Sequence, residues 1–275
     1  MRQIKIIDVA IAHVKCSSGW NKPRFFEWYR GKDERDTCFF TDVCVPQVDS
    51  VKAKCKVAWL LEPPTITGAS YDYVRNNLHK FNYVFTFIKD MVDNKKIFLA
   101  PIGGCWIPGP YGDIRNLPNQ YGLYDKPKTV SIIASDKEWL QGHKLRHDTI
   151  KRFTNGVDVY GRTYNPVANK LDALRNYKFS IAIENSKCDD YFTEKIIDCF
   201  VTGTIPIYWG TDSIINYFDG EGILRFNTLD ELQHILWNIH SFDIGRSVIE
   251  KNFEIAHRYT VAEDYIFWHY GHLFP

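Results

Sequence analysis

Residues 179–210 read FSIAIENSKCDDYFTEKIIDCFVTGTIPIYWG. The apolar runs at 179–185 and 204–210 predict two buried strands, and residues 191–203 between them predict a helix. Near-continuous apolar strands that are separated by helices are typical of a parallel sheet with both faces covered. This stretch therefore predicts an α/β fold.

The same alternation continues on both sides of this stretch. We predict strands at 3–14, 56–64, 81–87, 97–104, 129–135 and 156–161, helical segments at 71–79, 140–153, 167–176, 229–240 and 246–270, loop and helix at 20–37, and a long loop at 105–128. A loop of that length is often functional or links domains. Because 275 residues suffice for two compact units, we predict two Rossmann-like domains, residues 1–128 and residues 129–275, the second including the C-terminal helices.

The charge and cysteine content narrow the range of partners and compartments. The 34 basic and 33 acidic residues give a net charge of +1, which provides no overall field for nucleic acid. The seven cysteines are scattered and form no C-x-x-C pair, which argues against a zinc site and favours a reducing compartment. The apolar run at 3–14 is interrupted by Asp8 and His13 and resembles neither a signal peptide nor a membrane anchor. We therefore expect a soluble, cytoplasmic protein, which leaves room for peripheral contact with the inner face of a membrane.

A binding site is predicted where the strand at 179–185 ends in E-N-S, because open α/β sheets hold ligands at the carboxyl ends of their strands. The following helix begins near Tyr191, Glu194 and Lys195, and helix N-termini suit phosphate groups. We predict that Lys195 and the Tyr191 hydroxyl bind a diphosphate and leave a carboxylate for a ribose diol. The alternative is an ordinary charged first turn with a cap, which would be preferred for an isolated Y-x-x-E-K. The chain contains neither G-x-G-x-x-G nor a P-loop motif.

The combination of E-N-S, Y-x-x-E-K and G-x-I-P-I-Y-W-G within 179–210 closely resembles the donor-binding motif of the α1,3/α1,4-fucosyltransferases. These are inverting, GDP-fucose-dependent hexosyltransferases of the GT-B fold. The resemblance implies two Rossmann-like domains that face each other across a cleft. It also implies that Glu194 holds the ribose and that Asn185 lines the same pocket.

The resemblance extends upstream, to IIASDKEWLQGHKLRHDTIKRF at 132–153 and GVDVYGR at 156–162. An arginine of the corresponding helix reaches the donor phosphates in the family, and we match Arg146 to it, with His143, Lys144 and Arg152 as less specific neighbours. In the N-terminal half, WLLEPP places Glu62 after a strand, where the family keeps its general base. The glycine that conventionally precedes this glutamate is absent, so a solvated loop carboxylate is the alternative interpretation of Glu62.

Aspartates spaced as Asp-x-Asp, which bind a metal in many glycosyltransferases, are absent from the sequence. We therefore predict no divalent metal and no cofactor, with GDP-fucose as the donor substrate and an oligosaccharide as the acceptor. An α1,3-type linkage onto lipopolysaccharide or another N-acetylglucosamine-containing glycan fits the resemblance. Two alternatives remain open: a transferase for another GDP- or UDP-sugar, and an inactive nucleotide-sugar-binding protein. The joint presence of Glu62, Tyr191, Glu194 and Lys195 argues against the inactive protein.

Overall fold

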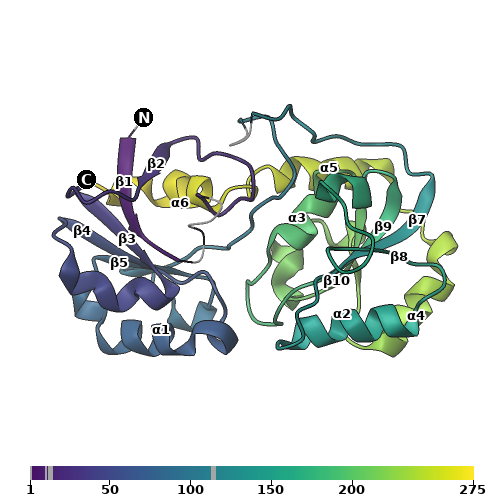
Figure 1. The fold of residues 1–275 in the computed structure, drawn as a ribbon, viewed down its shortest axis with the longest axis horizontal. Helices are drawn as coiled ribbons and strands as arrows, with labels where there is room; N and C mark the ends of the chain where they lie inside the picture. The colour runs from purple at the N-terminus through teal and green to yellow at the C-terminus, as the bar shows by residue number, and fades with distance from the viewer. Residues whose placement is uncertain (1, 10, 12–14, 113–115) are drawn as a thin grey trace.

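The computed structural model describes residues 2–9, 11, 15–112 and 116–275, and it divides into two α/β halves (Figure 1). The first half contains a six-stranded sheet in the order β2-β1-β3-β4-β5-β6. Its strands are β1 (Arg2–Ile7), β2 (Phe26–Tyr29), β3 (Thr37–Thr41), β4 (Cys55–Trp59), β5 (Tyr83–Thr86) and β6 (Ile97–Leu99). All of its paired strands run parallel.

The second half contains a five-stranded sheet in the order β11-β10-β9-β7-β8, and its paired strands are also parallel. Its strands are β7 (Lys128–Ile133), β8 (Asp158–Tyr160), β9 (Tyr177–Ile183), β10 (Ile205–Trp209) and β11 (Leu224–Arg225). The helices are α1 (Pro64–Asn76) in the first half, α2 (Gln141–Arg152), α3 (Glu194–Phe200), α4 (Leu229–Trp237) and α5 (Arg246–Ala256) in the second, and α6 (Ala262–Tyr270) near the end of the chain. The predicted α/β class with two parallel-sheet halves is confirmed.

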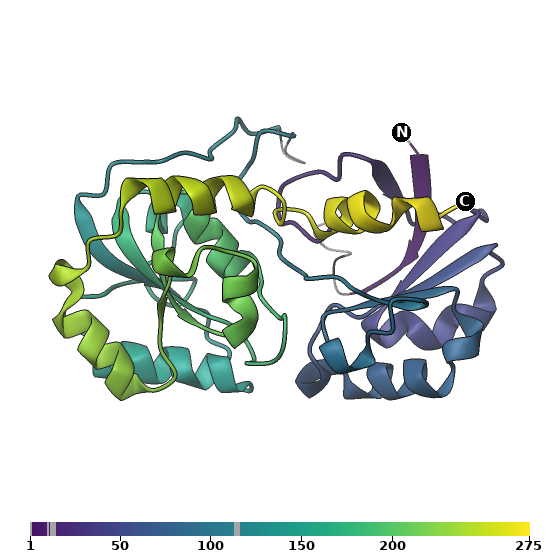
Figure 2. The ribbon, with the colours of Figure 1, turned by 180° about the vertical axis from the view of Figure 1, so that it is seen from behind.

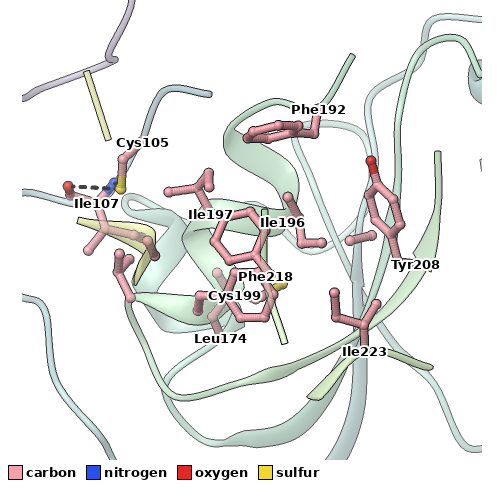
Figure 3. Close-up of a cluster of buried hydrophobic side chains, with 14 of the residues drawn as sticks. Cys105, Ile107, Leu174, Phe192, Ile196, Ile197, Cys199, Tyr208, Phe218 and Ile223 are labelled. Atoms are coloured by element: carbon pink, nitrogen blue, oxygen red, sulfur yellow. Dashed lines mark hydrogen bonds between the residues drawn. The ribbon is translucent and has the colours of Figure 1, made fainter. Parts of the chain in front are cut away.

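Helix α3 is fixed to the second sheet by a buried core that also includes the segment linking the two halves. Ile196 and Ile197 of α3 pack with Cys105 and Ile107 of the linking segment and with Phe218 (Figure 3). All five side chains are fully or almost fully buried. Because well-packed interiors resist deformation, the start of α3 is held rigidly next to the ends of β9 and β10.

The C-terminal helices lie across both halves. Helix α5 packs on the second half, whereas α6 lies beside the first sheet (Figure 2). Ala262 and Ile266 of α6 share one core with Ile4, Trp59 and Phe85. The last residues of the chain are therefore tied to its first strand, and the predicted boundary between residues 128 and 129 stays a prediction.

Several predicted elements differ from those observed. The segment 20–37, predicted as loop and helix, contains the strand β2, and the buried strand β3 was not predicted. Strand β2 has one fully buried residue, Phe26, so its sequence lacks the apolar run of a central strand. The strand predicted at 3–14 ends at Ile7, and residues 10 and 12–14 of that prediction lie outside the described residues.

Three of the predicted helices also differ from the observed helices in their bounds. The helix expected at 167–176 is only a 3-10 turn, Lys170–Ala173. The helix expected at 71–79 begins earlier, at Pro64, because a proline is well suited to the first turn of a helix. The helical segment 246–270 is broken between Ala256 and Ala262, where the chain crosses from the second half to the first.

Candidate functional site

A cavity of about 330 Å³ opens at the carboxyl end of the second sheet. Among the described residues, its charged lining consists of five cations and two carboxylates: Lys137, Arg146, Arg162, Lys170 and Lys195, and Glu194 and Asp198. This excess of positive charge in a concave, partly buried site attracts an anionic ligand. A diphosphate carries enough negative charge to balance it.

Arg146 lies in the middle of α2, and its side chain is almost fully buried. Its Nε and Nη2 atoms donate to the Ile183 carbonyl at 3.0 and 2.6 Å, and Nη2 also donates to Asn185 Oδ1 at 2.9 Å. The structure therefore brings Arg146 and Asn185 together in the cavity wall. Burial lowers the pKa of Arg146, although Glu184 and Glu194 oppose this shift, and the guanidinium stays charged.

A glycine permits this close approach of α2 to the end of β9. The Gly142 N–H donates to the Asn185 carbonyl at 3.0 Å. A Cβ atom on Gly142 would lie 1.7 Å from the Glu184 carbonyl oxygen, which no side chain could tolerate. His143 follows and lines the cavity. Burial, and then Arg146 and Lys137, lower the pKa of His143 to about 4, so its ring is neutral at physiological pH.

Glu184 directly follows the buried strand β9, and its carboxylate fixes the start of α3. Its two carboxylate oxygens accept hydrogen bonds from the Thr193 N–H at 2.8 Å and the Thr193 hydroxyl at 2.7 Å. Lys195 Nζ lies 3.5 Å from Glu184 Oε2, and it donates to Thr193 Oγ1 at 3.1 Å and to Glu194 Oε1 at 3.2 Å. The Lys195 ammonium is thus held at the cavity by neighbouring oxygens on the same loop.

Glu194 belongs to a partly buried charge network that the sequence predicted only in part. Its Oε1 atom accepts from Lys170 Nζ at 3.3 Å, and Lys170 also donates to Asp198 Oδ2 at 3.1 Å. Burial alone would raise the pKa of Glu194, but Lys195 and Lys170 overcome this effect and hold that pKa well below its usual value. Glu194 is therefore ionised and stays available as an acceptor for hydroxyl groups.

Lys170 and Asp198 were not predicted as site residues. Asp198 lies four residues after Glu194 on α3, so helical spacing could have indicated it. Lys170 lies in a short 3-10 turn, and only the tertiary structure places its ammonium between two carboxylates and 5.4 Å from the centroid of the Trp106 ring. No local motif carries that signal.

Tyr191 is placed differently from Lys195. Its side chain is buried, its ring centroid lies 5.1 Å from that of Phe87 in the first half, and it is not among the residues that line the cavity. Burial raises the pKa of Tyr191 well above its usual value, and Glu62 raises it further. The structure thus places Tyr191 at the contact between the halves, and its predicted contact with the diphosphate stays a prediction.

Glu62 follows β4 in the first half and is partly buried. The N–H groups of Leu61 and Glu62 donate to Asp42 Oδ1 at 2.9 and 3.2 Å, and the Tyr71 hydroxyl donates to the Glu62 carbonyl at 2.9 Å. These contacts fix the backbone, while the Glu62 carboxylate has no hydrogen-bond partner within the described part of the chain. Asp42 adopts a φ of 41°, an uncommon left-handed conformation for a residue with a side chain.

The Glu62 carboxyl group lies within electrostatic range of charged side chains of the cavity site. Burial raises the pKa of Glu62, Lys195 lowers it, Glu194 raises it and Lys137 lowers it. Close by, the hydroxyl groups of Thr65 and Ser186 form a 2.9 Å hydrogen bond between the two halves. The structure therefore brings Glu62 to the same region as Arg146, Asn185, Glu194 and Lys195, although these come from different sheets.

Two of the less specific candidates lie elsewhere. Lys144 is exposed on α2 and does not line the cavity. Arg152 forms an ion pair with Asp230 at 2.6 Å on the surface. No cluster of three or more His, Cys, Asp or Glu side chains that could hold a metal ion is found among the residues in the described ranges. Over the same ranges, none of the helices has the length and apolar character that crossing a membrane requires.

Known proteins resemble this chain over its second half and in its overall fold. A family model described as glycosyltransferase family 10 (fucosyltransferase), C-terminal part, matches residues 123–269, more than half of the chain. The α-(1,3)-fucosyltransferase FucT of Helicobacter pylori is 34% identical over 97 residues, covering 34% of this chain and 20% of that protein. The α-(1,3)-fucosyltransferase fut-6 of Caenorhabditis elegans is 31% identical over 159 residues, covering 50% and 35%.

A solved structure of an α1,3-fucosyltransferase with GDP superposes with a TM-score of 0.53 at 17% sequence identity. The match covers 96% of this chain and 93% of that one, so the two share a fold. The chain spans from a fifth to about a third of the length of the two curated relatives.

Proposed function

Because the chain belongs to glycosyltransferase family 10, the fucosyltransferases, we propose that it transfers fucose from GDP-fucose to a hydroxyl group of a glycan acceptor. The observation that carries the proposal is the position of Glu62, whose carboxyl group lies within electrostatic range of Lys195, Glu194 and Lys137 of a cationic cavity in the other half of the molecule. A transferase needs this pairing, since one side must stabilise the leaving diphosphate and the other must activate the acceptor.

On the donor side, the diphosphate lies in the cavity near Lys195 and Arg146. As the bond between the anomeric carbon and the β-phosphate oxygen breaks, negative charge accumulates on GDP. Fixed cations in a partly buried site stabilise that charge without reorganising, and one such interaction contributes roughly 2.7–4 kcal/mol to transition-state stabilisation. The ionised Glu194 accepts hydrogen bonds from the ribose hydroxyls, and Asn185 lines the same pocket.

On the acceptor side, Glu62 takes the proton of the attacking hydroxyl group. Burial raises its pKa, which makes it a stronger base than an exposed glutamate, while the nearby Lys195 favours its ionised form. The acceptor oxygen forms its bond to the anomeric carbon as GDP leaves from the opposite face. This single displacement inverts the anomeric centre and, from β-linked GDP-fucose, gives an α linkage. We propose that the attacking hydroxyl group is the one that gives a linkage of the 1,3 type.

We further propose that the reaction requires no divalent metal and no cofactor. The five cations of the cavity support this proposal, because they can perform the charge neutralisation for which other glycosyltransferases use a metal ion. We also propose a cytoplasmic location. The seven cysteines support it, because all are unpaired and six are buried. Contact with the inner face of a membrane, where lipid-linked glycans are made, belongs to the same proposal.

A donor panel tests the proposed function. Purified protein is incubated with GDP-fucose, GDP-mannose, UDP-galactose or UDP-N-acetylglucosamine together with N-acetyllactosamine, and release of the nucleotide is measured. We expect release from GDP-fucose alone, with the same rate in excess EDTA. Turnover of UDP-sugars only would contradict the fucose assignment, and a rate abolished by EDTA and restored by Mn²⁺ would contradict metal independence. Binding of GDP without turnover of any donor would favour the inactive protein.

A further inference from the structure

Trp139 is one of the most exposed aromatic side chains of the described residues, with 68% of its surface accessible. It lies in the short loop between β7 and α2. Its ring stacks on His143, with centroids 5.8 Å apart and an angle of 20° between the planes, and Lys137 Nζ lies 5.7 Å from its ring centroid. The indole is thus supported by two neighbours and still open to solvent.

The two side chains that support Trp139 belong to the cavity. Both Lys137 and His143 line it, so the exposed indole lies beside the cavity wall. His143 is followed on α2 by Arg146, whereas Gly161 and Arg162 belong to the β8 side of the cavity wall. Trp139 therefore lies on the α2 side of the cavity and not on its β8 side.

That side is the one nearest to the first half of the molecule. The charged groups that act on the Glu62 carboxyl are Lys195, Glu194 and Lys137, and they do not include Arg162 or Lys170. Helix α2 begins against Asn185, whose neighbour Ser186 contacts Thr65 in the first half. The loop that carries Trp139 is therefore close to Glu62, the proposed base, and to the contact between the halves.

We propose that Trp139 forms an acceptor subsite, in which the indole stacks on the apolar face of a pyranose ring of the glycan. Hexopyranose rings present C–H groups on one face, and a large aromatic ring with an open side packs well against such a face. The inference rests on the proposed function, since it assigns the acceptor side of the same site. A second candidate occupant, the purine base of the donor, is an outcome of the test below.

The test compares Trp139→Ala and Trp139→Phe with Trp237→Ala, a matched control. Trp237 is 74% exposed at the end of α4, in the second half but outside the residues that line the cavity. Each protein is loaded with GDP and titrated with N-acetyllactosamine, and sugar binding is followed by saturation-transfer difference NMR. GDP affinity is measured separately by calorimetry, without sugar. Circular dichroism checks the fold, which truncating an exposed side chain should leave intact.

We expect Trp139→Ala to raise the dissociation constant of the sugar about tenfold, Trp139→Phe to recover much of the loss, and Trp237→Ala to change nothing. GDP affinity should be the same in all four proteins. An unchanged sugar affinity in Trp139→Ala, or no sugar signal with the wild type, overturns the subsite. A weaker affinity of Trp139→Ala for GDP, measured without sugar, would show instead that the indole contacts the purine base of the donor. Because these readouts need no turnover, sugar binding without transfer from GDP-fucose would contradict the proposed function and leave the subsite standing.

Discussion

Each half has a glutamate shortly after an inner strand of its sheet, and the surroundings of these two glutamates differ. Glu184 directly follows β9, the central strand of the second sheet, and Glu62 follows β4 of the first. Glu184 is fully buried and both of its carboxylate oxygens accept hydrogen bonds from Thr193. Glu62 is held only through its backbone, by Asp42 and Tyr71, and its carboxyl group lies within electrostatic range of the cavity.

This difference separates a structural carboxylate from a reactive one. A carboxylate with both oxygens bonded holds a loop in place, because moving it would leave buried donors unsatisfied. A carboxylate on a fixed backbone with its oxygens open can accept a proton from a substrate. Both residues are glutamates that follow a parallel strand, Glu184 at once and Glu62 after two intervening residues. The residue type therefore does not assign the role, and the partners determine it.

The largest expected effect is that of Glu62→Gln. The amide keeps the shape and cannot take a proton, so we expect kcat for fucose transfer to fall by about a thousandfold. GDP affinity, measured by calorimetry, should stay within about twofold of the wild type, because the cavity is in the other half. Transfer by Glu62→Gln at more than a tenth of the wild-type rate would show that another group is the base.

Lys195→Ala comes next, because it removes a cation from the donor side. We expect kcat to fall by about a hundredfold, in line with the loss of one fixed charge that stabilises the leaving group. The substitution also tests the connection between the halves. Since Lys195 lowers the pKa of Glu62, the acidic limb of the pH profile of kcat/KM should move to higher pH in Lys195→Ala.

Lys144→Ala serves as the control for Lys195→Ala, because Lys144 is an exposed lysine of α2 that does not line the cavity. Its kcat and its pH profile should match those of the wild type. An equal loss in both variants would mean that the effect arises from the net charge of the protein and not from the site.

Glu184→Gln should lower the stability of the fold and leave the proton transfer unchanged. A glutamine offers one oxygen acceptor where Thr193 presents two donors, so one buried hydrogen bond is lost. We expect the free energy of unfolding to fall by about 1–3 kcal/mol, measured by urea denaturation. The acidic limb of the pH profile should keep its wild-type position within error. A displaced limb would give Glu184 a part in the proton transfer and would remove the distinction between the two glutamates.

The sequence predicted the second half better than the first, for physical reasons. Strands β9 and β10 are buried along almost their whole length, with only Lys178 partly exposed, because helices cover both faces of the sheet. Strand β2 lies at a sheet edge with a single fully buried residue, so its pattern resembles that of a loop. Strand β3 is short and lies next to a polar segment, and it was not predicted.

The site residues also divide into those that a local sequence pattern predicted and those that only the tertiary structure brings into place. Arg146, Asn185, Glu194 and Lys195 were all predicted, and all four line one cavity. Lys170 was missed because a lysine in a short 3-10 turn carries no local signal, and only folding places it between Glu194 and Asp198. Asp42 was missed for a similar reason, since its partner backbone lies 19 and 20 residues further along the chain.

The smallest expected effect is that of Asp42→Asn, which changes charge but keeps an oxygen that can accept from the N–H groups of Leu61 and Glu62. Burial raises the pKa of Asp42 to about 7, so this group carries only part of a negative charge near neutral pH. The charged groups that interact electrostatically with Glu62 are Lys195, Glu194, Lys137 and Asp42. Removing the residual negative charge of Asp42 should therefore lower the pKa of Glu62 by only a few tenths of a pH unit. Because the base must be ionised, the acidic limb of kcat/KM should move to lower pH by the same amount.

Asp42→Ala provides the contrast to Asp42→Asn, because it removes the oxygen that fixes the Glu62 backbone as well as the charge. We expect kcat to fall by about tenfold in Asp42→Ala, since a base that is less well positioned spends less time in reach of the acceptor hydroxyl. GDP affinity should be unchanged in both variants. If Asp42→Asn lost as much activity as Asp42→Ala, charge and not position would be the contribution of Asp42, and the account of Glu62 as a carboxylate held through its backbone would be wrong.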